Sequence, residues 1–183
     1  YAPQTTRDSE GRRVMEGWIR MPKPAEEGWI GMFCLPRIVE RKGNHIYFRM
    51  HPNVRAAYSK EITDISCASE DGYMAVFELE DGETADIGGF LIKRKGNRIQ
   101  TDRTAVYPSF EGAHLLSETP ELTDGCRIEV LADKNLIEVY INDGEYVISN
   151  AVYGIGDFIK VNIEKTVHLY TLKEHGERTR GEE

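Results

Sequence analysis

The sequence predicts an all-β protein: an antiparallel β-sandwich preceded by a smaller group of strands. From residue 65 onwards, seven or more short segments alternate apolar and polar residues with a period of two, the period of a half-buried strand. Turn residues such as Gly, Asp and Asn separate these segments at regular intervals. Helical patterns are scarce. This combination is typical of an antiparallel sandwich.

Residues 1–50 differ in character from the rest. They carry both tryptophans and predict three or four strands, joined by turns at GR, PKPAEEG and KGN. Strands that expose Trp and Met on both sides cannot bury their own apolar surface, which is the situation of one propeller blade separated from its neighbours. We therefore expect residues 1–50 to be the remnant of a blade.

Residues 51–63 are expected to be a linker with one or two helical turns. Pro52 and Asn53 can start a helix, and Ala56 and Ala57 favour one. The segment is nevertheless short and poorly amphipathic, so a longer helix is not expected.

The sandwich is expected over residues 64–173. In YMAVFELE (73–80) the residues Tyr73, Ala75, Phe77 and Leu79 share one face, and an Asp-Gly turn follows. In LIEVYIN (136–142) one face carries Ile137, Val139 and Ile141, and the other carries Leu136, Glu138 and Tyr140. Further strands are expected at 87–94, 98–103, 126–132, 145–149, 158–163 and 166–173. The tail, 174–183, has no apolar residue, so we expect it to be flexible.

Composition and charge exclude several classes of partner. The formal net charge is −8, so the chain lacks the basic surface that neutralises nucleic acid phosphates. No apolar run is long enough to cross a bilayer, and no membrane partner is expected. The start shows no signal peptide pattern and lacks Met, so we expect it to be the interior of a longer polypeptide.

Cysteine and histidine spacing predicts neither a metal nor another cofactor. Cys34, Cys67 and Cys126 lie far apart without a C-x-x-C spacing, which argues against a disulfide framework and a structural zinc site. The histidines show no H-E-x-x-H spacing, and no calcium loop is apparent. We expect buried free thiols, which favour a cytoplasmic location over a secreted one.

The run LIEVYINDGEYVISN contains three acids that resemble the paired carboxylates of glycosidases. Asp143 and Glu145 flank a tight turn, so we expect both to be solvated at a hairpin tip. Glu138 lies mid-strand and needs a partner. Asp133 and an arginine, Arg127 or Arg103, are candidates for a structural network around it, although such a cluster can also hold a sugar hydroxyl.

Aromatic residues in the loop AVYPSFEGAH offer a possible sugar platform. Tyr107, Phe110 and His114 are able to stack on a sugar ring if they are exposed. Loop aromatics also often plug the rim of a sandwich, and this second interpretation is favoured.

Two stretches of the sequence resemble one enzyme family. YAPQT, DSEGRRVMEGWIRMP and GWIGMFCLPR resemble the end of the five-bladed propeller in glycoside hydrolase family 32, the β-fructosidases that include invertases and sucrose-6-phosphate hydrolases. CRIEVLADKNLIEVYINDGEYVISNAVY resembles a hairpin of that family's C-terminal sandwich. Both occur in family order, and the resemblance covers the chain up to about Leu172. It implies that the first strands belong to the last blade of a five-bladed propeller.

The resemblance also implies that no catalytic residue lies in this sequence. The family's catalytic carboxylates belong to N-D-P-N, R-D-P and E-C motifs, and none of these is present: Asp8 is followed by Ser9, Asp143 is followed by Gly144, and no Glu precedes a Cys. Carried over from the last blade, as residues bordering the family's sugar pocket, are Trp18, Tyr1 and Gln4. The implied partners are a missing N-terminal propeller domain and a fructosyl saccharide substrate.

Three functions remain in view. The first is the C-terminal part of a β-fructofuranosidase-type hydrolase whose parent cleaves sucrose, sucrose 6-phosphate or fructans with retention, and which is inactive as the chain stands. The second is a lectin-like carbohydrate-binding module. The third is a structural or oligomerisation domain, which pairs through open strand edges into a homo-oligomer.

Overall fold

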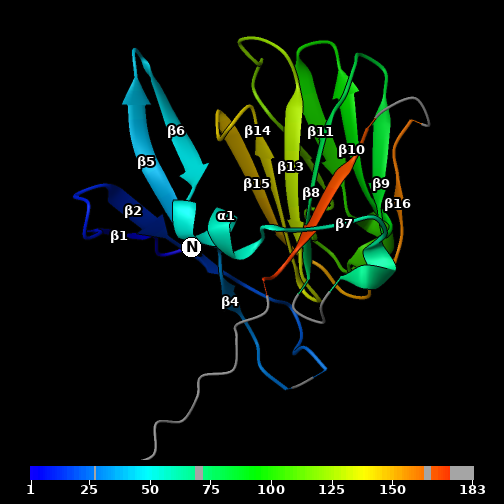
Figure 1. Ribbon diagram of the computed structural model, residues 1–183. Coiled ribbons are helices and arrows are strands. Elements are labelled where there is room, and N and C mark those ends of the chain that lie inside the picture. The colour runs from blue at the N-terminus through cyan, green and yellow to red at the C-terminus, as the bar shows by residue number, and fades with distance from the viewer. Residues whose placement is uncertain (27, 69–71, 163–165, 174–183) are drawn as a thin grey trace, which may run out of the picture.

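The predicted all-β class and antiparallel sandwich are confirmed. The computed structural model of the chain describes residues 1–26, 28–68, 72–162 and 166–173. Across these ranges the strands form antiparallel sheets of four, two, five and six strands, none of which is closed into a barrel. The sheets of five and six strands pack face to face as the sandwich, and the four-stranded sheet lies beside them (Figure 1).

The N-terminal part consists of two small sheets. The four-stranded sheet has the order β1-β2-β5-β6, with β1 at Gln4–Arg7, β2 at Arg13–Glu16, β5 at Arg37–Lys42 and β6 at His45–Met50. Between β2 and β5 the chain makes a two-stranded ribbon of β3 (Trp18–Ile19) and β4 (Met32–Phe33).

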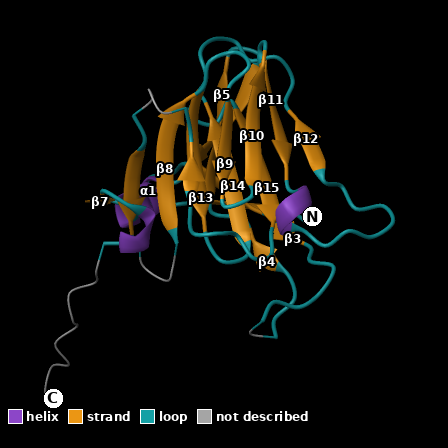
Figure 2. Ribbon diagram, turned by 90° about the vertical axis from the view of Figure 1, so that its right-hand side faces the viewer, coloured by secondary structure: helices purple, strands orange, loops and turns teal. Residues whose placement is uncertain are grey.

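A short helix leads from the four-stranded sheet to the sandwich. The predicted helical turns are present as α1 (Pro52–Ala57), and Figure 2 shows α1 beside β7 (Lys60–Ile62) at one edge of the molecule. His51 caps the helix, because its Nδ1 accepts a hydrogen bond from the backbone N–H of Asn53 at 3.1 Å. Its Nε2 lies 3.3 Å from Oδ2 of Asp8, so the cap is also tied to the turn between β1 and β2.

The sandwich pairs a six-stranded sheet with a five-stranded sheet. The first has the order β15-β14-β13-β8-β17-β7, with β8 at Tyr73–Glu78, β13 at Arg127–Ala132, β14 at Leu136–Ile141, β15 at Tyr146–Ala151 and β17 at His168–Thr171. The second has the order β12-β11-β10-β9-β16, with β9 at Thr84–Ile87, β10 at Phe90–Lys95, β11 at Arg98–Asp102, β12 at Leu116–Glu118 and β16 at Ile159–Lys160. The 3-10 turns are η1 (Ile65–Cys67) and η2 (Thr104–Val106).

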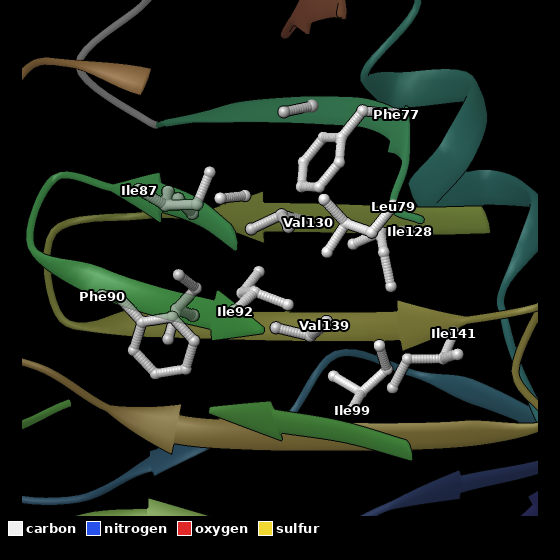
Figure 3. Close-up of a cluster of buried hydrophobic side chains, with 14 of the residues drawn as sticks. Phe77, Leu79, Ile87, Phe90, Ile92, Ile99, Ile128, Val130, Val139 and Ile141 are labelled. Atoms are coloured by element: carbon white, nitrogen blue, oxygen red, sulfur yellow. The ribbon is translucent and has the colours of Figure 1, made fainter. Parts of the chain in front are cut away.

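The main core lies between these two sheets. Apolar side chains from both sheets meet there (Figure 3), among them Phe77, Ile128, Val130, Val139, Ile141, Ile87, Phe90, Ile92 and Ile99. The predicted inward faces of β8 and β14 are confirmed, since their alternate residues all belong to this cluster.

The outer face of the six-stranded sheet is buried as well. All six residues of β14 are buried, although a period-two pattern predicts that alternate residues face solvent. On that outer face Leu131 and Tyr140 pack with Met50 and Tyr58, which come from the N-terminal part and the end of α1. The six-stranded sheet is therefore the middle layer of the protein.

Several expectations differ from the structure. The described part of residues 1–50 holds six strands rather than three or four, and the expected linker 51–63 includes β7 of the six-stranded sheet. The segment 87–94 is two strands, because Gly88 and Gly89 have φ of +57° and +99° and turn the chain between β9 and β10. The strand expected at 158–163 is only Ile159–Lys160 within the described residues. Cys67 is exposed, although Cys34 and Cys126 are the buried free thiols expected. The tail, 174–183, lies outside the described residues.

Truncation of the main core is predicted to be costly. Phe90 is fully buried, so Phe90→Ala should lower the free energy of unfolding by about 3–5 kcal/mol through lost burial and a residual cavity. Urea denaturation measures this change. Leu116 is 67% exposed, so Leu116→Ala serves as the control and should stay within about 0.5 kcal/mol of the parent. Equal losses in the two variants would contradict the placement of the core.

Candidate functional site

Glu138 is the centre of a buried polar cluster on the outer face of β14. Its side chain is 0% exposed, and Oε1 lies 2.5 Å from Nη2 of Arg37, a residue of β5. The hydroxyl of Ser149 donates to the same carboxylate at 2.7 Å, and the hydroxyl of Tyr140 donates to Oε2 at 2.7 Å. The carboxylate therefore has a charged partner and two further donors, as a buried charge requires.

The predicted arginine partner of Glu138 is wrong. Arg127 binds Glu129, and Arg103 donates to the carbonyl groups of His114 and Ala151. The ion-pair partner of Glu138 is Arg37, 101 residues away in sequence. This is possible because the outer face of the sheet is covered by the N-terminal part rather than by another strand of the sandwich.

Asp133 does not join the cluster around Glu138. It is exposed in the turn between β13 and β14, and its carboxylate accepts a hydrogen bond from the backbone N–H of Lys134 at 2.6 Å. Glu138 instead uses partners from β5, β14 and β15.

A second buried acid, Glu129, makes a similar contact one strand away. Its side chain is 1% exposed, and both carboxylate oxygens bind the guanidinium of Arg55 on α1, with Oε2 at 2.7 Å from Nη2. Nη2 of Arg127 adds a contact at 2.9 Å. Burial disfavours the charged form, but the hydrogen bonds and charges of the two arginines outweigh it and lower the pKa of Glu129.

The hairpin between β14 and β15 makes the third contact with the N-terminal part. Asn142 and Asp143 have φ of +48° and +58°, which confirms the tight turn expected from the Asn-Asp-Gly sequence. Asp143 forms an ion pair with Arg49 of β6 and lies 3.9 Å from Nη2 of Arg55. Its side chain is 47% exposed, so this pair contributes less than the buried ones.

The expectation that Glu145 is solvated is wrong. Glu145 is 2% exposed, and its Oε1 accepts a hydrogen bond from the backbone N–H of Thr123 at 2.7 Å. Oε2 accepts from the side-chain amide of Asn142 at 2.8 Å. Through these two hydrogen bonds the buried carboxylate of Glu145 joins the hairpin turn to the segment that precedes β13.

The tip of this hairpin fits closely against β6. The backbone N–H of Phe48 donates to the carbonyl of Gly144 at 2.8 Å. A Cβ on Gly144 would lie 2.4 Å from the carbonyl oxygen of Phe48, and Gly144 has φ of +90°. Only glycine satisfies both conditions.

Three of the acids described above thus form an acid–arginine joint, which we define as the pairs Glu138–Arg37, Glu129–Arg55 and Asp143–Arg49. Each pair links the six-stranded sheet or its hairpin to the N-terminal part or α1. A glycosidase acid must be kept protonated near neutral pH, and its partner must reach the anomeric carbon. Glu129 does not meet the first requirement, because its two arginines lower its pKa.

Of the residues expected at a sugar pocket, Tyr1 and Trp18 lie together and Gln4 does not. The rings of Tyr1 and Trp18 are 6.1 Å apart between centroids and are oriented edge to face. Both line a pocket of about 440 Å³ that also contains Arg37 and Ser149 of the joint. Gln4 is exposed on β1 opposite Glu16, outside that lining.

The aromatic loop supports the plug interpretation for Tyr107. This ring packs against a small apolar cluster around Met21 and Ala25, and Arg103 lies 3.6 Å from its centroid. Phe110 is 48% exposed beside it, and His114 is also exposed. Tyr107 therefore closes the gap between the sandwich and the segment that follows β3.

Metal and membrane features were sought across the described ranges only. There, no group of three or more His, Cys, Asp or Glu side chains is placed to hold a metal ion. Likewise, α1 and the other described helices are too short to cross a bilayer.

The sequence matches a known domain family over most of its length. Residues 53–175 match the family described as glycosyl hydrolases family 32 C terminal. The chain is 24% identical to sucrose-6-phosphate hydrolase of Vibrio alginolyticus, over 94% of this chain and 39% of that protein. It is 26% identical to sucrose-6-phosphate hydrolase of Bacillus subtilis, over 81% of this chain and 35% of that protein. The chain thus spans less than half the length of these relatives.

Solved structures agree on the fold. The sucrose-6-phosphate hydrolase of Lactobacillus gasseri superposes with a TM-score of 0.77 at 16% identity, over 94% of this chain and 41% of that chain. The glycoside hydrolase family 32 structure of Bifidobacterium adolescentis gives a TM-score of 0.69 at 21% identity, over 94% of this chain and 31% of that chain. At 94% coverage the superposed region includes most of the first fifty residues as well as the sandwich.

Breaking the Glu138–Arg37 pair on one side is predicted to destabilise the protein more than removing it whole. Glu138→Leu leaves a buried guanidinium without its counter-charge and should lower the free energy of unfolding by about 3–5 kcal/mol. The double variant Arg37→Met/Glu138→Leu should recover much of that loss, because neither charge remains. Urea denaturation of the parent, both single variants and the double variant tests this. Strictly additive losses would contradict a direct pair.

Stability is predicted to fall in acid partly through Glu129. Because its pKa is lowered in the folded state, its stabilisation is complete above the ordinary value of 4.5 and is lost as pH falls from there through the lowered value. Chemical denaturation between pH 7 and pH 3 should therefore show a shallower decline for Glu129→Gln than for the parent. The exposed-acid control, Glu111→Gln, should keep the parent slope. Parallel curves for all three proteins would refute the assignment.

Proposed function

This chain belongs to the glycoside hydrolase family 32 C-terminal family, and we propose from that premise that it is the C-terminal part of a longer β-fructosidase-type hydrolase. In this proposal the chain supports the catalytic part and does not itself perform the reaction. The observation that carries it is the acid–arginine joint, which uses the acids of the carboxylate-rich hairpin region to fix the N-terminal strands on the sandwich.

An exposed apolar surface supports the presence of a preceding domain. Around the ribbon of β3 and β4, Trp29, Ile30 and Phe33 are 41%, 54% and 67% exposed, and Trp18 is 37% exposed. A cluster of large apolar side chains of this kind marks a contact surface. We assign it to the remaining blades of a five-bladed propeller, with residues 1–50 as the last blade. Residues 51–63 are then a linker that ends in β7 of the six-stranded sheet, and 64–173 are the rest of the supporting sandwich.

The reaction proposed for the parent is hydrolysis of a fructosyl bond with retention. Relatives named sucrose-6-phosphate hydrolase and raffinose invertase support a fructosyl saccharide such as sucrose or sucrose 6-phosphate. The retaining mechanism needs two carboxyl groups about 5 Å apart. The proposal takes both from the part of the protein that precedes this sequence, and Tyr1 and Trp18 border the pocket that they serve. By the same analogy we propose a cytoplasmic location.

Activity measurements test whether hydrolysis requires the part of the protein that precedes this chain. The purified 183-residue chain should release neither glucose nor fructose from sucrose. It should also release no fructose from sucrose 6-phosphate. The protein extended by its upstream coding sequence should hydrolyse at least one of them. Turnover by the chain alone would overturn the supporting role, and an inactive extended protein would overturn the hydrolase assignment.

The contact surface can be tested separately from activity. Phe33 and Leu116 are both 67% exposed in this chain, but only Phe33 belongs to the proposed contact. Phe33→Asp should therefore lower the Tm of the extended protein by several degrees while leaving that of the chain nearly unchanged. Leu116→Asp should change neither. Equal effects of both variants on the extended protein would contradict the proposed contact.

A further inference from the structure

A second pocket lies at one end of the sandwich. Its volume is about 610 Å³, and three connecting segments enclose it: η1, the turn between β13 and β14, and the loop that precedes β16. Its apolar lining includes Ile65 and Ile155, and its polar lining includes Ser66, Asp133 and Asp157. Loops that gather at the end of a rigid sandwich are a common location for binding residues.

Tyr73 is the unusual member of this lining. Its side chain belongs to the main core and is only 6% exposed, yet among the described residues its hydroxyl has no hydrogen-bond partner. Burial raises the pKa of Tyr73, and the negative charge of Asp157 raises it further, so the ring carries a neutral hydroxyl near a carboxylate. A buried donor without a partner requires an explanation, and an acceptor brought by a ligand supplies one.

The walls of this pocket are fixed by contacts that only glycine permits. Gly72 has φ of +92°, and a Cβ there would lie 2.2 Å from the carbonyl oxygen of Ala132. On the opposite side, a Cβ on Gly88 would lie 2.3 Å from the carbonyl oxygen of Gly156, whose N–H donates to the carbonyl of Gly88 at 2.9 Å. The segments on both sides of Tyr73 are therefore held close to the ends of the strands, and the pocket is preformed.

We propose that this end pocket binds a neutral polyhydroxylated ligand, the terminal residue of a saccharide. A sugar hydroxyl is able to accept a hydrogen bond from the hydroxyl of Tyr73 and donate one to the carboxylate of Asp157. Ile65 and Ile155 offer apolar surface to the C–H face of the ring. Asp133 and Asp157 together disfavour an anion, and the ammonium of Lys134 in the same lining offsets part of their attraction for a cation.

This inference goes beyond the supporting role proposed above. It gives the sandwich a saccharide contact of its own, and it stands whether or not the parent protein hydrolyses fructosyl bonds. Its test is a binding measurement on the 183-residue chain, whereas the hydrolase proposal is tested by turnover of the extended protein. The failure of one is therefore distinguishable from the failure of the other.

Calorimetric titration of the chain with fructose, sucrose and a short fructan tests the proposal, with inorganic phosphate as the anionic comparison. We expect saturable binding of at least one saccharide at millimolar concentration and none of phosphate. Tyr73→Phe removes only the hydroxyl and should weaken that binding about fivefold to tenfold, the effect of one hydrogen bond. Asp157→Asn should weaken it by a similar factor. Tyr170→Phe is the matched control, because Tyr170 lines a different pocket, and it should bind as the parent does.

Folding of the variants is checked by thermal denaturation. Tyr73→Phe should melt at or above the Tm of the parent, since it removes an unpaired buried hydroxyl. No saccharide binding by the parent chain would overturn the proposal and leave a water molecule as the partner of Tyr73. Saccharide binding that is equal in the parent and in Tyr73→Phe would also overturn it, and so would phosphate binding that competes with the saccharide.

Discussion

Two-sided burial of the six-stranded sheet is the constraint on which the rest of the structure depends. One face meets the five-stranded sheet through aliphatic and aromatic side chains, and the other is covered by β5, β6 and α1. A charge on the covered face loses its water, and burying it is tolerable only with a counter-charge in good geometry. Glu138 and Glu129 meet this condition with Arg37 and Arg55.

The same constraint bears on the chemistry open to the acids of this region. Catalysis by paired carboxylates needs one acid that stays protonated and one that is free to attack. In this chain the arginines hold Glu129 in its ionised form, and Glu145 accepts hydrogen bonds from Asn142 in its own hairpin and from Thr123 before β13. Glu138 and Asp143 of this region contact the N-terminal part, through Arg37 and Arg49.

Specific packing then fixes how the N-terminal strands sit on the sandwich. Gly144 lets the hairpin tip approach the backbone of β6, and His51 ties the start of α1 to the turn between β1 and β2. The buried ion pairs restrict how the two parts can be arranged, because any arrangement that separates a pair leaves a buried charge without its partner. The pocket that contains Tyr1 and Trp18 also contains Arg37 and Ser149, so the joint and the pocket share residues.

The sequence alone determined the class of fold and the inward faces of the strands, because alternation with a period of two reports local burial directly: Phe77 and Val139 are in the core as expected. It also determined the turn at Asn142 and Asp143, since positive φ is a local property. Only the tertiary structure decided that Arg37 binds Glu138 and that Glu145 is buried. Those contacts join residues from different layers, and periodicity carries no information about which layer covers an outer face.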